Sequence, residues 1–177
     1  MNRFDDCLSF TTGRNVEGGT SNNVADTGGL TQNGITQATY DDWRTKQGLP
    51  VQPVTGMAWS EEYAIYQSEY WAPNHCDQLP VPVDLCVFDC DVNSGDGRAA
   101  KLLQQCAGVT QDSDIGPGTL AAVGAMDAMS LAAAFCNARE AYVRAIAANN
   151  PTQTIFLEGW LNRINLVRQQ CGLPVQP

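Results

Sequence analysis

Residues 17–36 read EGGTSNNVADTGGLTQNGIT, and this stretch differs in character from the rest of the chain. Glycine, asparagine, threonine and serine surround two isolated carboxylates, Glu17 and Asp26. These residue types are typical of turns, so we expect turns here and at most a short hairpin. The stretch is either a solvated turn region or one wall of an active site, and general turn statistics alone favour the first.

The sequence on both sides of this stretch has the spacing of α-helices. Apolar residues recur every three or four positions from Phe4 to Thr11, which predicts a first helix that ends near Gly18–Gly19 and carries Glu17 at its C-terminal end. Further helices are predicted over residues 36–47, 60–72, 83–92, 99–107, 119–129, 131–148 and 152–170, with Thr36 or Thr39 capping the first of them and Ser60 the second. The expected fold class is therefore mostly α, with six to eight helices.

Composition limits the classes of protein to which the chain can belong. Its 177 residues, 44% hydrophobic and 16% charged, suit one domain with a real core. No apolar run reaches the roughly 20 residues needed to span a bilayer, and the N-terminus MNRFDDCLSF lacks the pattern of a signal peptide. The net charge of -9 argues against non-specific binding to nucleic acid or to an anionic membrane.

The seven cysteines give no sign of a metal centre. They contain no CxxC pair, and the chain has a single histidine, His75, so zinc-ligand spacing is absent. We interpret the cysteines as small buried hydrophobic residues. If the protein works outside the cytoplasm, the sequence does not decide whether some of them form a disulfide. The acidic loop DSDIGPG at 112–118 lacks the ligand count of an EF-hand. No metal and no cofactor is expected.

The stretch at 17–36 resembles the glutamate-glycine-glycine signature of glycoside hydrolase family 108, the phage-type N-acetylmuramidases. Four later segments are similar to motifs of the same family, in the expected order: AIYQSEYW at 64–71, LPVPVDLCVFDCDVNSG at 79–95, GVTQDSDIGPGTLAAV at 108–123 and FLEGWLNRI at 156–164. Each motif alone is weak, but together they are specific. The resemblance implies one lysozyme-like domain over residues 1–177, with a catalytic half at 1–95 and a helical, peptidoglycan-binding-like half at 96–177.

The resemblance also assigns roles to particular residues. The family's catalytic glutamate falls on Glu17, which would be the general acid, and Asp26 with Thr31 would position or activate the water. It favours Asp89 and Asn93, one helical turn apart, as residues of the substrate cleft.

Two further residues complete the predicted substrate-binding set, Tyr70 and Thr36. Tyr66, Tyr70 and Trp71 could stack on sugar rings, but aromatic residues at helical spacing are more often core, and this second interpretation is preferred for the group. The lone His75 is expected to be structural or exposed.

Two functions from different classes follow. The first is a muramidase that cleaves the β-1,4 bond between N-acetylmuramic acid and N-acetylglucosamine in bacterial peptidoglycan. The second is a virion- or secretion-apparatus component that uses the same fold as a structural or wall-binding module, with phage tail or baseplate proteins as partners. In either case we expect synthesis in the host cytoplasm, and action on the periplasmic cell wall or carriage on the virion.

Overall fold

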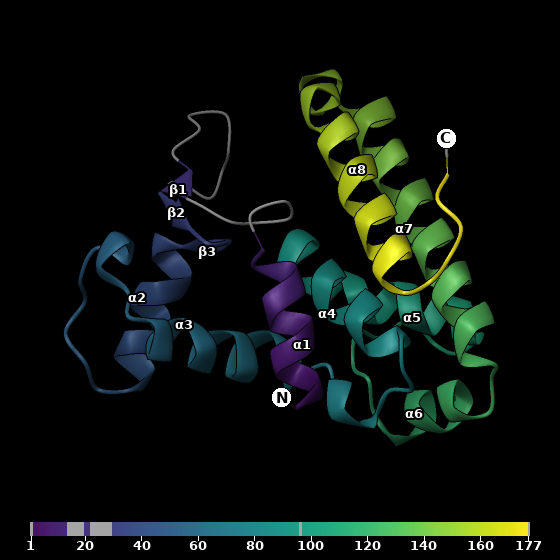
Figure 1. The fold of residues 1–177 in the computed structure, drawn as a ribbon, viewed down its shortest axis with the longest axis horizontal. Helices are drawn as coiled ribbons and strands as arrows, with labels where there is room; N and C mark the ends of the chain where they lie inside the picture. The colour runs from purple at the N-terminus through teal and green to yellow at the C-terminus, as the bar shows by residue number, and fades with distance from the viewer. Residues whose placement is uncertain (1, 14–19, 22–29, 96, 177) are drawn as a thin grey trace. The chain divides into compact units, whose positions relative to one another are not determined.

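The computed structural model describes residues 2–13, 20–21, 30–95 and 97–176, which form two compact units, 1–72 and 73–177 (Figure 1). The mostly α, lysozyme-like class predicted from the sequence is confirmed, since the described residues contain eight α-helices and three two-residue strands. The boundary between the units falls at Ala72–Pro73, whereas the two predicted halves divide at residues 95 and 96. Helix α4 (Val83–Ser94) belongs to the second unit because it packs on α5 (Arg98–Ala107) and α7 (Ala128–Asn149).

The first unit begins with α1 (Arg3–Thr11), whose two ends are fixed by local hydrogen bonds. At its start, Asn2 Oδ1 accepts from the Asp5 backbone N–H at 2.9 Å, and Asp5 Oδ2 accepts from the Asn2 N–H at 3.1 Å. At its end, the Thr12 hydroxyl donates to the Leu8 carbonyl at 2.8 Å. The helix therefore ends well before Gly18–Gly19, and the prediction that it reaches Glu17 is wrong.

A small antiparallel sheet in the order β1-β2-β3 follows, made of β1 (Thr20–Ser21), β2 (Thr31–Gln32) and β3 (Ile35–Thr36). Asn33 and Gly34 join the last two strands with φ angles of 49° and 85°. Two consecutive positive φ values are typical of the tight hairpin turn that Asn-Gly favours. The predicted short hairpin is thus confirmed.

The hairpin leads directly into α2 (Gln37–Lys46), because Thr36 Oγ1 accepts from the Thr39 N–H at 3.2 Å. Of the two predicted cap residues, Thr36 and Thr39, Thr36 is therefore the one that caps the helix. After the 3₁₀ turn η1 (Val54–Gly56), α3 (Trp59–Ile65) continues into a π-helical segment, η2 (Tyr66–Trp71). The predicted cap Ser60 is wrong. Ala58 is the cap residue, and its N–H donates to Glu61 Oε2 at 3.0 Å.

The second unit is built around α4, in which every residue from Val83 to Asp91 is buried. Helices α7 and α8 (Thr154–Gln170) lie side by side, joined by the 3₁₀ turn η4 (Pro151–Gln153) (Figure 1). The remaining elements are η3 (Cys76–Gln78) and α6 (Pro117–Gly124). None of the described helices is by itself long and apolar enough to cross a membrane, although the bent pair α6–α7 meets the length and composition criteria together.

The predicted helix over 119–129 is in fact divided between two helices. Helix α6 ends at Gly124, and α7 begins at Ala128 with Asp127 as its cap. The Asp127 carboxylate accepts from the Ser130 N–H at 2.8 Å, which starts a new helix inside an alanine-rich run.

Candidate functional site

The two predicted catalytic carboxylates, Glu17 and Asp26, lie outside the described residues. The described element that follows them in the chain is the β2–β3 hairpin, where Thr31 and Thr36 are directly paired across the strands. Directly opposed residues of an antiparallel pair project from the same face, and both threonines are half-buried. The Thr36 hydroxyl caps α2, so its role in substrate binding stays a prediction, as does that of Thr31.

The tip of the hairpin is attached to α3 and η2. The Asn33 side-chain amide donates to Glu62 Oε2 at 2.9 Å, and the Tyr66 hydroxyl donates to the Asn33 carbonyl. Glu62 is buried, and burial raises the pKa of its carboxyl, against which the Asn33 hydrogen bond acts. These contacts fix the hairpin that carries Thr31 to α3 and η2. No local sequence pattern points to this contact, because Asn33 and Glu62 are 29 positions apart.

A second polar cluster fixes α2 against the start of α3. The carboxylate of Glu61 accepts from the Tyr40 hydroxyl at 2.7 Å and forms an ion pair with Arg44. The Arg44 guanidinium also donates to the Pro50 carbonyl at 2.6 Å, and its side chain is buried. Arg44 is thus a structural cation, neutralised within its own unit.

The aromatic residues of η2 have different environments. Tyr66 and Trp71 are core residues, as preferred from their spacing. Tyr70 is half-buried, and its ring centroid lies 5.4 Å from that of Tyr66 in a tilted arrangement. A sugar contact by Tyr70 stays a prediction.

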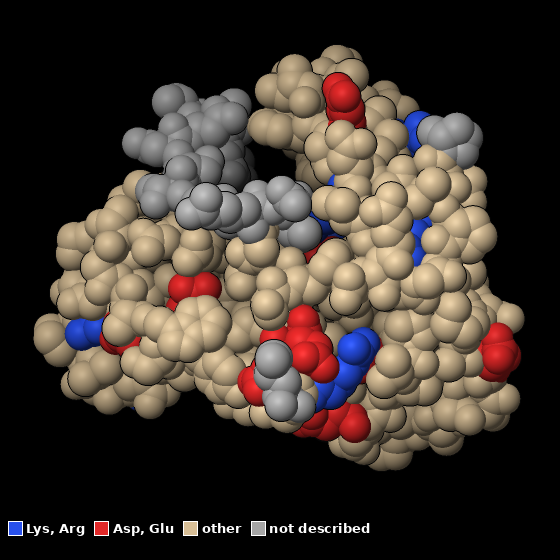
Figure 2. Space-filling view, in the orientation of Figure 1, with Lys and Arg blue, Asp and Glu red and all other residues tan. Residues whose placement is uncertain are grey.

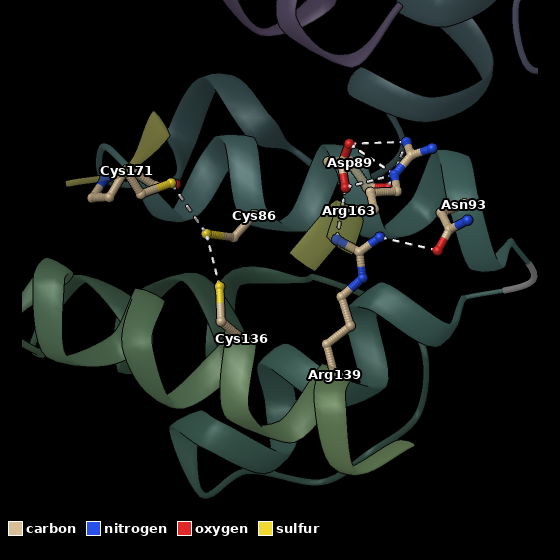
Figure 3. A network of polar contacts seen from close by, with 8 residues as sticks. Cys86, Asp89, Asn93, Cys136, Arg139, Arg163 and Cys171 are labelled. Carbon is tan, nitrogen blue, oxygen red and sulfur yellow. Dashed lines mark hydrogen bonds and ion pairs between the residues drawn. The ribbon is translucent and has the colours of Figure 1, made fainter. Parts of the chain in front are cut away.

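In the second unit, Asp89 of α4 lies at the centre of a buried ionic network (Figure 3). Its Oδ2 accepts from Arg139 of α7 at 2.7 Å, and its Oδ1 accepts from Arg163 of α8 at 2.9 Å. Asp89 has no exposed surface, and Arg139 and Arg163 are 1% and 5% exposed. Burial alone would raise the pKa of Asp89, but the charges of Arg163 and Arg139 outweigh it and hold this pKa below its ordinary value.

This geometry corrects the expected role of Asp89. A carboxylate without exposed surface, with both oxygens held by guanidinium groups, does not contact a polysaccharide directly. The expectation that Asp89 and Asn93 share one helix face is confirmed, because Arg139 also donates to Asn93 Oδ1 at 3.1 Å (Figure 3). Asp89 therefore supports Asn93 through Arg139.

Asn93 itself lines a pocket of about 170 Å³ within the second unit. A guanidinium only donates hydrogen bonds, so the Asn93 oxygen faces Arg139 and its amide nitrogen points away from it. Arg98 lies over the ring of another lining residue, Tyr142, at 4.3 Å from the ring centroid. The pocket thus combines hydrogen-bonding groups with aromatic surface. Its lining residues are Asn93, Ser94, Tyr142, Val143, Ile146, Gln153 and Trp160.

The acidic loop between α5 and α6 is organised by an internal glutamine. The Gln104 amide donates to Asp112 Oδ1 at 2.6 Å and to the Asp114 carbonyl at 2.9 Å. Its oxygen accepts from the Ser113 N–H at 3.1 Å. One carboxylate oxygen of Asp112 and the Asp114 carbonyl thus both accept from the neutral Gln104 side chain, which fixes the shape of this loop.

The cysteines are free thiols, six of them buried and Cys106 partly so. Cys86 lies between two others, with its Sγ 3.9 Å from Cys136 Sγ and 3.7 Å from Cys171 Sγ (Figure 3). Groups of histidine, cysteine and acidic side chains arranged to hold a metal ion are absent from the described part of the chain.

Charged side chains are sparse on the face of the molecule drawn in Figure 2. On the face drawn in Figure 2 they form small separate groups among uncharged atoms, and the described residues show no extended basic patch there. This agrees with the low charged fraction of 16%.

Comparison with known proteins identifies two families along the chain. Residues 11–95 match the glycosyl hydrolase 108 family, and residues 98–165 match a family described as a predicted peptidoglycan domain. The structure of Brucella abortus SagA is similar, with 34% sequence identity and a TM-score of 0.83 over 95% of this chain and 92% of that one. The comparison with curated proteins finds no match. The chain therefore belongs to the glycosyl hydrolase 108 family and is a glycoside hydrolase whose second matched region is a peptidoglycan domain.

Proposed function

We propose that this peptidoglycan hydrolase is an N-acetylmuramidase, a lysozyme, that cleaves the β-1,4 bond between N-acetylmuramic acid and N-acetylglucosamine. Glu17 is the general acid that protonates the leaving oxygen, and Asp26 with Thr31 positions the attacking water. The observation that carries the proposal is the coincidence of two matches: the hydrolase family covers all three residues, and a peptidoglycan domain follows it directly.

The described geometry supports this proposal in two places. The hairpin that carries Thr31 is attached to α3 and η2 through Asn33, so the threonine is held on a supported element, as a positioning group requires. In the second unit, Asn93 directs its amide nitrogen away from Arg139, and that nitrogen can donate to an acetamido carbonyl of the glycan. Asp89 acts there as a positioning residue.

The experiment compares the full chain with Glu17→Gln on purified peptidoglycan. Glutamine is nearly the same shape but cannot donate the proton, so we expect solubilisation to fall by about 10²- to 10⁴-fold. Glu158→Gln, which removes an exposed carboxyl of α8, is the matched control and should keep the wild-type rate. Wild-type activity of Glu17→Gln would reject the catalytic assignment.

The products identify the bond that is cleaved. Reduction of the new chain ends with borohydride should give muramitol for a muramidase and glucosaminitol for a glucosaminidase. A product without a reducing end would indicate non-hydrolytic cleavage and would reject the proposal.

The alternative, a wall-binding or structural module of a virion or secretion apparatus, is favoured by one observation. The net charge of -9 gives no long-range attraction to an anionic wall, which a particle-delivered protein does not need. Binding to walls with no new reducing ends, in wild type and Glu17→Gln alike, would support this alternative.

A further inference from the structure

A row of aromatic rings in the first unit leads from the core to the solvent. Trp71 and Phe4 are buried, with ring centroids 5.2 Å apart. Phe4 packs edge-on against Tyr63 at 5.0 Å, and Tyr63 in turn against Trp59 at 6.2 Å. Trp59 is 60% exposed, and it is the one aromatic residue among the exposed large hydrophobic side chains of the described chain. An indole this exposed contributes little to the core, and most of its surface is accessible to a ligand.

Trp59 and Tyr63 form one side of a pocket with a volume of about 440 Å³. The other side is the face of α1 that carries Asp5, Leu8 and Ser9, continued by Thr12. A pocket of this volume is within the range of small-molecule sites. Within this unit it therefore offers a ligand both an aromatic face and polar side chains.

The polar side of the pocket is held in place before any ligand binds. The Tyr63 hydroxyl donates to Asp5 Oδ1 at 2.9 Å, and Asp5 Oδ2 accepts from the Asn2 N–H at 3.1 Å. The Thr12 hydroxyl donates to the Leu8 carbonyl, so its oxygen keeps the capacity to accept. Carboxylate and hydroxyl oxygens next to a flat apolar ring suit a pyranose, which has an apolar C–H face and hydroxyl groups around its rim.

The charge of the pocket selects among sugars. Asp5 is the single charged residue among the described residues that line it. A carboxylate in the pocket repels a ligand that carries its own carboxylate, such as muramic acid or its peptide stem, whereas N-acetylglucosamine is neutral. The same charge, together with the net charge of -9, disfavours an anionic membrane as the partner of Trp59.

We propose that the pocket formed by Trp59, Tyr63 and α1 is a glycan subsite that binds an N-acetylglucosamine residue, stacked on the indole. The ligand would be part of a peptidoglycan strand, so this proposal rests on the proposed function. Thr12 precedes Glu17 by five positions in the sequence, so the subsite belongs to the part of the chain that leads directly into the proposed catalytic residue.

The test is calorimetric titration of triacetylchitotriose, a trimer of N-acetylglucosamine, into the full chain with Glu17→Gln to prevent turnover. Saturable binding is expected. It should weaken about tenfold or more in Trp59→Ala and less in Trp59→Phe, which keeps a smaller ring. Val51→Ala is the matched control, because it also removes an exposed apolar side chain from the first unit and should leave the affinity unchanged.

A second titration tests the charge argument. Muramyl dipeptide should bind more weakly than the trimer, and Asp5→Asn should reduce this difference while keeping an oxygen that accepts from Tyr63. The subsite is overturned if the trimer shows no saturable binding, if Trp59→Ala binds like its parent, or if muramyl dipeptide binds better than the trimer. These readouts do not involve catalysis, so the subsite and the proposed role of Glu17 can fail separately.

Discussion

Replacing Asp89 by asparagine should strongly destabilise the second unit. In the wild type, Arg139 and Arg163 donate to this one carboxylate at 2.7 Å and 2.9 Å, and all three side chains are buried. Asparagine keeps one acceptor oxygen but removes the negative charge that both guanidinium groups face. Breaking a buried ion pair in this way typically costs 3–5 kcal/mol.

Because two arginines share the carboxylate, we expect a loss near the top of that range, about 5 kcal/mol. Whole-protein stabilities are typically about 5–15 kcal/mol, so the variant should unfold at a much lower urea concentration. The measurement is urea unfolding followed by circular dichroism, with hydrogen exchange of the α4 amides to locate the change.

Asp91→Asn is the matched control, since it makes the same substitution at another buried carboxylate of α4, one that accepts from the neutral amide of Asn74 at 2.8 Å. It should cost less than Asp89→Asn, because an asparagine oxygen can still accept from this neutral amide. If Asp89→Asn were no worse than this control, the two arginines would have other sufficient partners and the electrostatic argument would be wrong.

The same network predicts a pH dependence with a definite sign. The pKa of Asp89 is lowered in the folded protein from its ordinary value of 3.8. Its contribution to stability is therefore fully present above that value and is lost as the pH falls through the lower, folded-state pKa. The wild type should lose this stability in acid below about pH 3.8, and Asp89→Asn should lack this part of the pH dependence.

Two further predictions concern salt and the thiols. Initial rates of wall clearing should rise between 0.01 M and 0.1 M salt. The reason is that the Debye length falls from about 30 Å to about 10 Å, which screens the repulsion between a chain of charge -9 and an anionic wall. A steady fall in the rates would instead indicate a local cluster of positive charge. In the native protein Cys106 should be alkylated first, because it alone among the cysteines is only partly buried, whereas burial raises the pKa of Cys90 to about 11. Mass spectrometry should count seven modified thiols after unfolding without reductant, and a count of five would reveal a disulfide.

Local features of the fold could be predicted where neighbouring residues determine them. The short hairpin expected before Thr36, and the cap at Thr36, one of the two residues predicted for it, depend on side chains within three positions, and both are confirmed. The double glycine predicts a helix end near Gly18–Gly19, whereas α1 ends at Thr11 with Thr12 as its C-terminal cap. Ser60 was a plausible cap, but Glu61 reached back to Ala58 instead.

Features of the site that depend on distant partners could not be predicted in the same way. The spacing of Asp89 and Asn93 correctly places them on one face of α4. It does not show that Arg139 and Arg163, 50 and 74 positions from Asp89, enclose its carboxylate. Periodicity therefore reveals which residues share a helix face. How far those residues are buried depends on the helices that pack on that face from elsewhere in the chain.

Two buried carboxylates, Glu62 and Asp89, show why burial alone does not identify a catalytic acid. Burial raises the pKa of Glu62, whose side-chain partner Asn33 is neutral, whereas two guanidinium groups lower that of Asp89. The two pKa values shift in opposite directions because the partners differ in charge, although both carboxylates are buried. Both carboxylates hold structure in place, Glu62 at the hairpin tip and Asp89 beside Asn93. A raised pKa at Glu62 is thus explained by its structural position, and the proposed general acid is instead Glu17, because residues 17–36 resemble the family's glutamate-glycine-glycine signature.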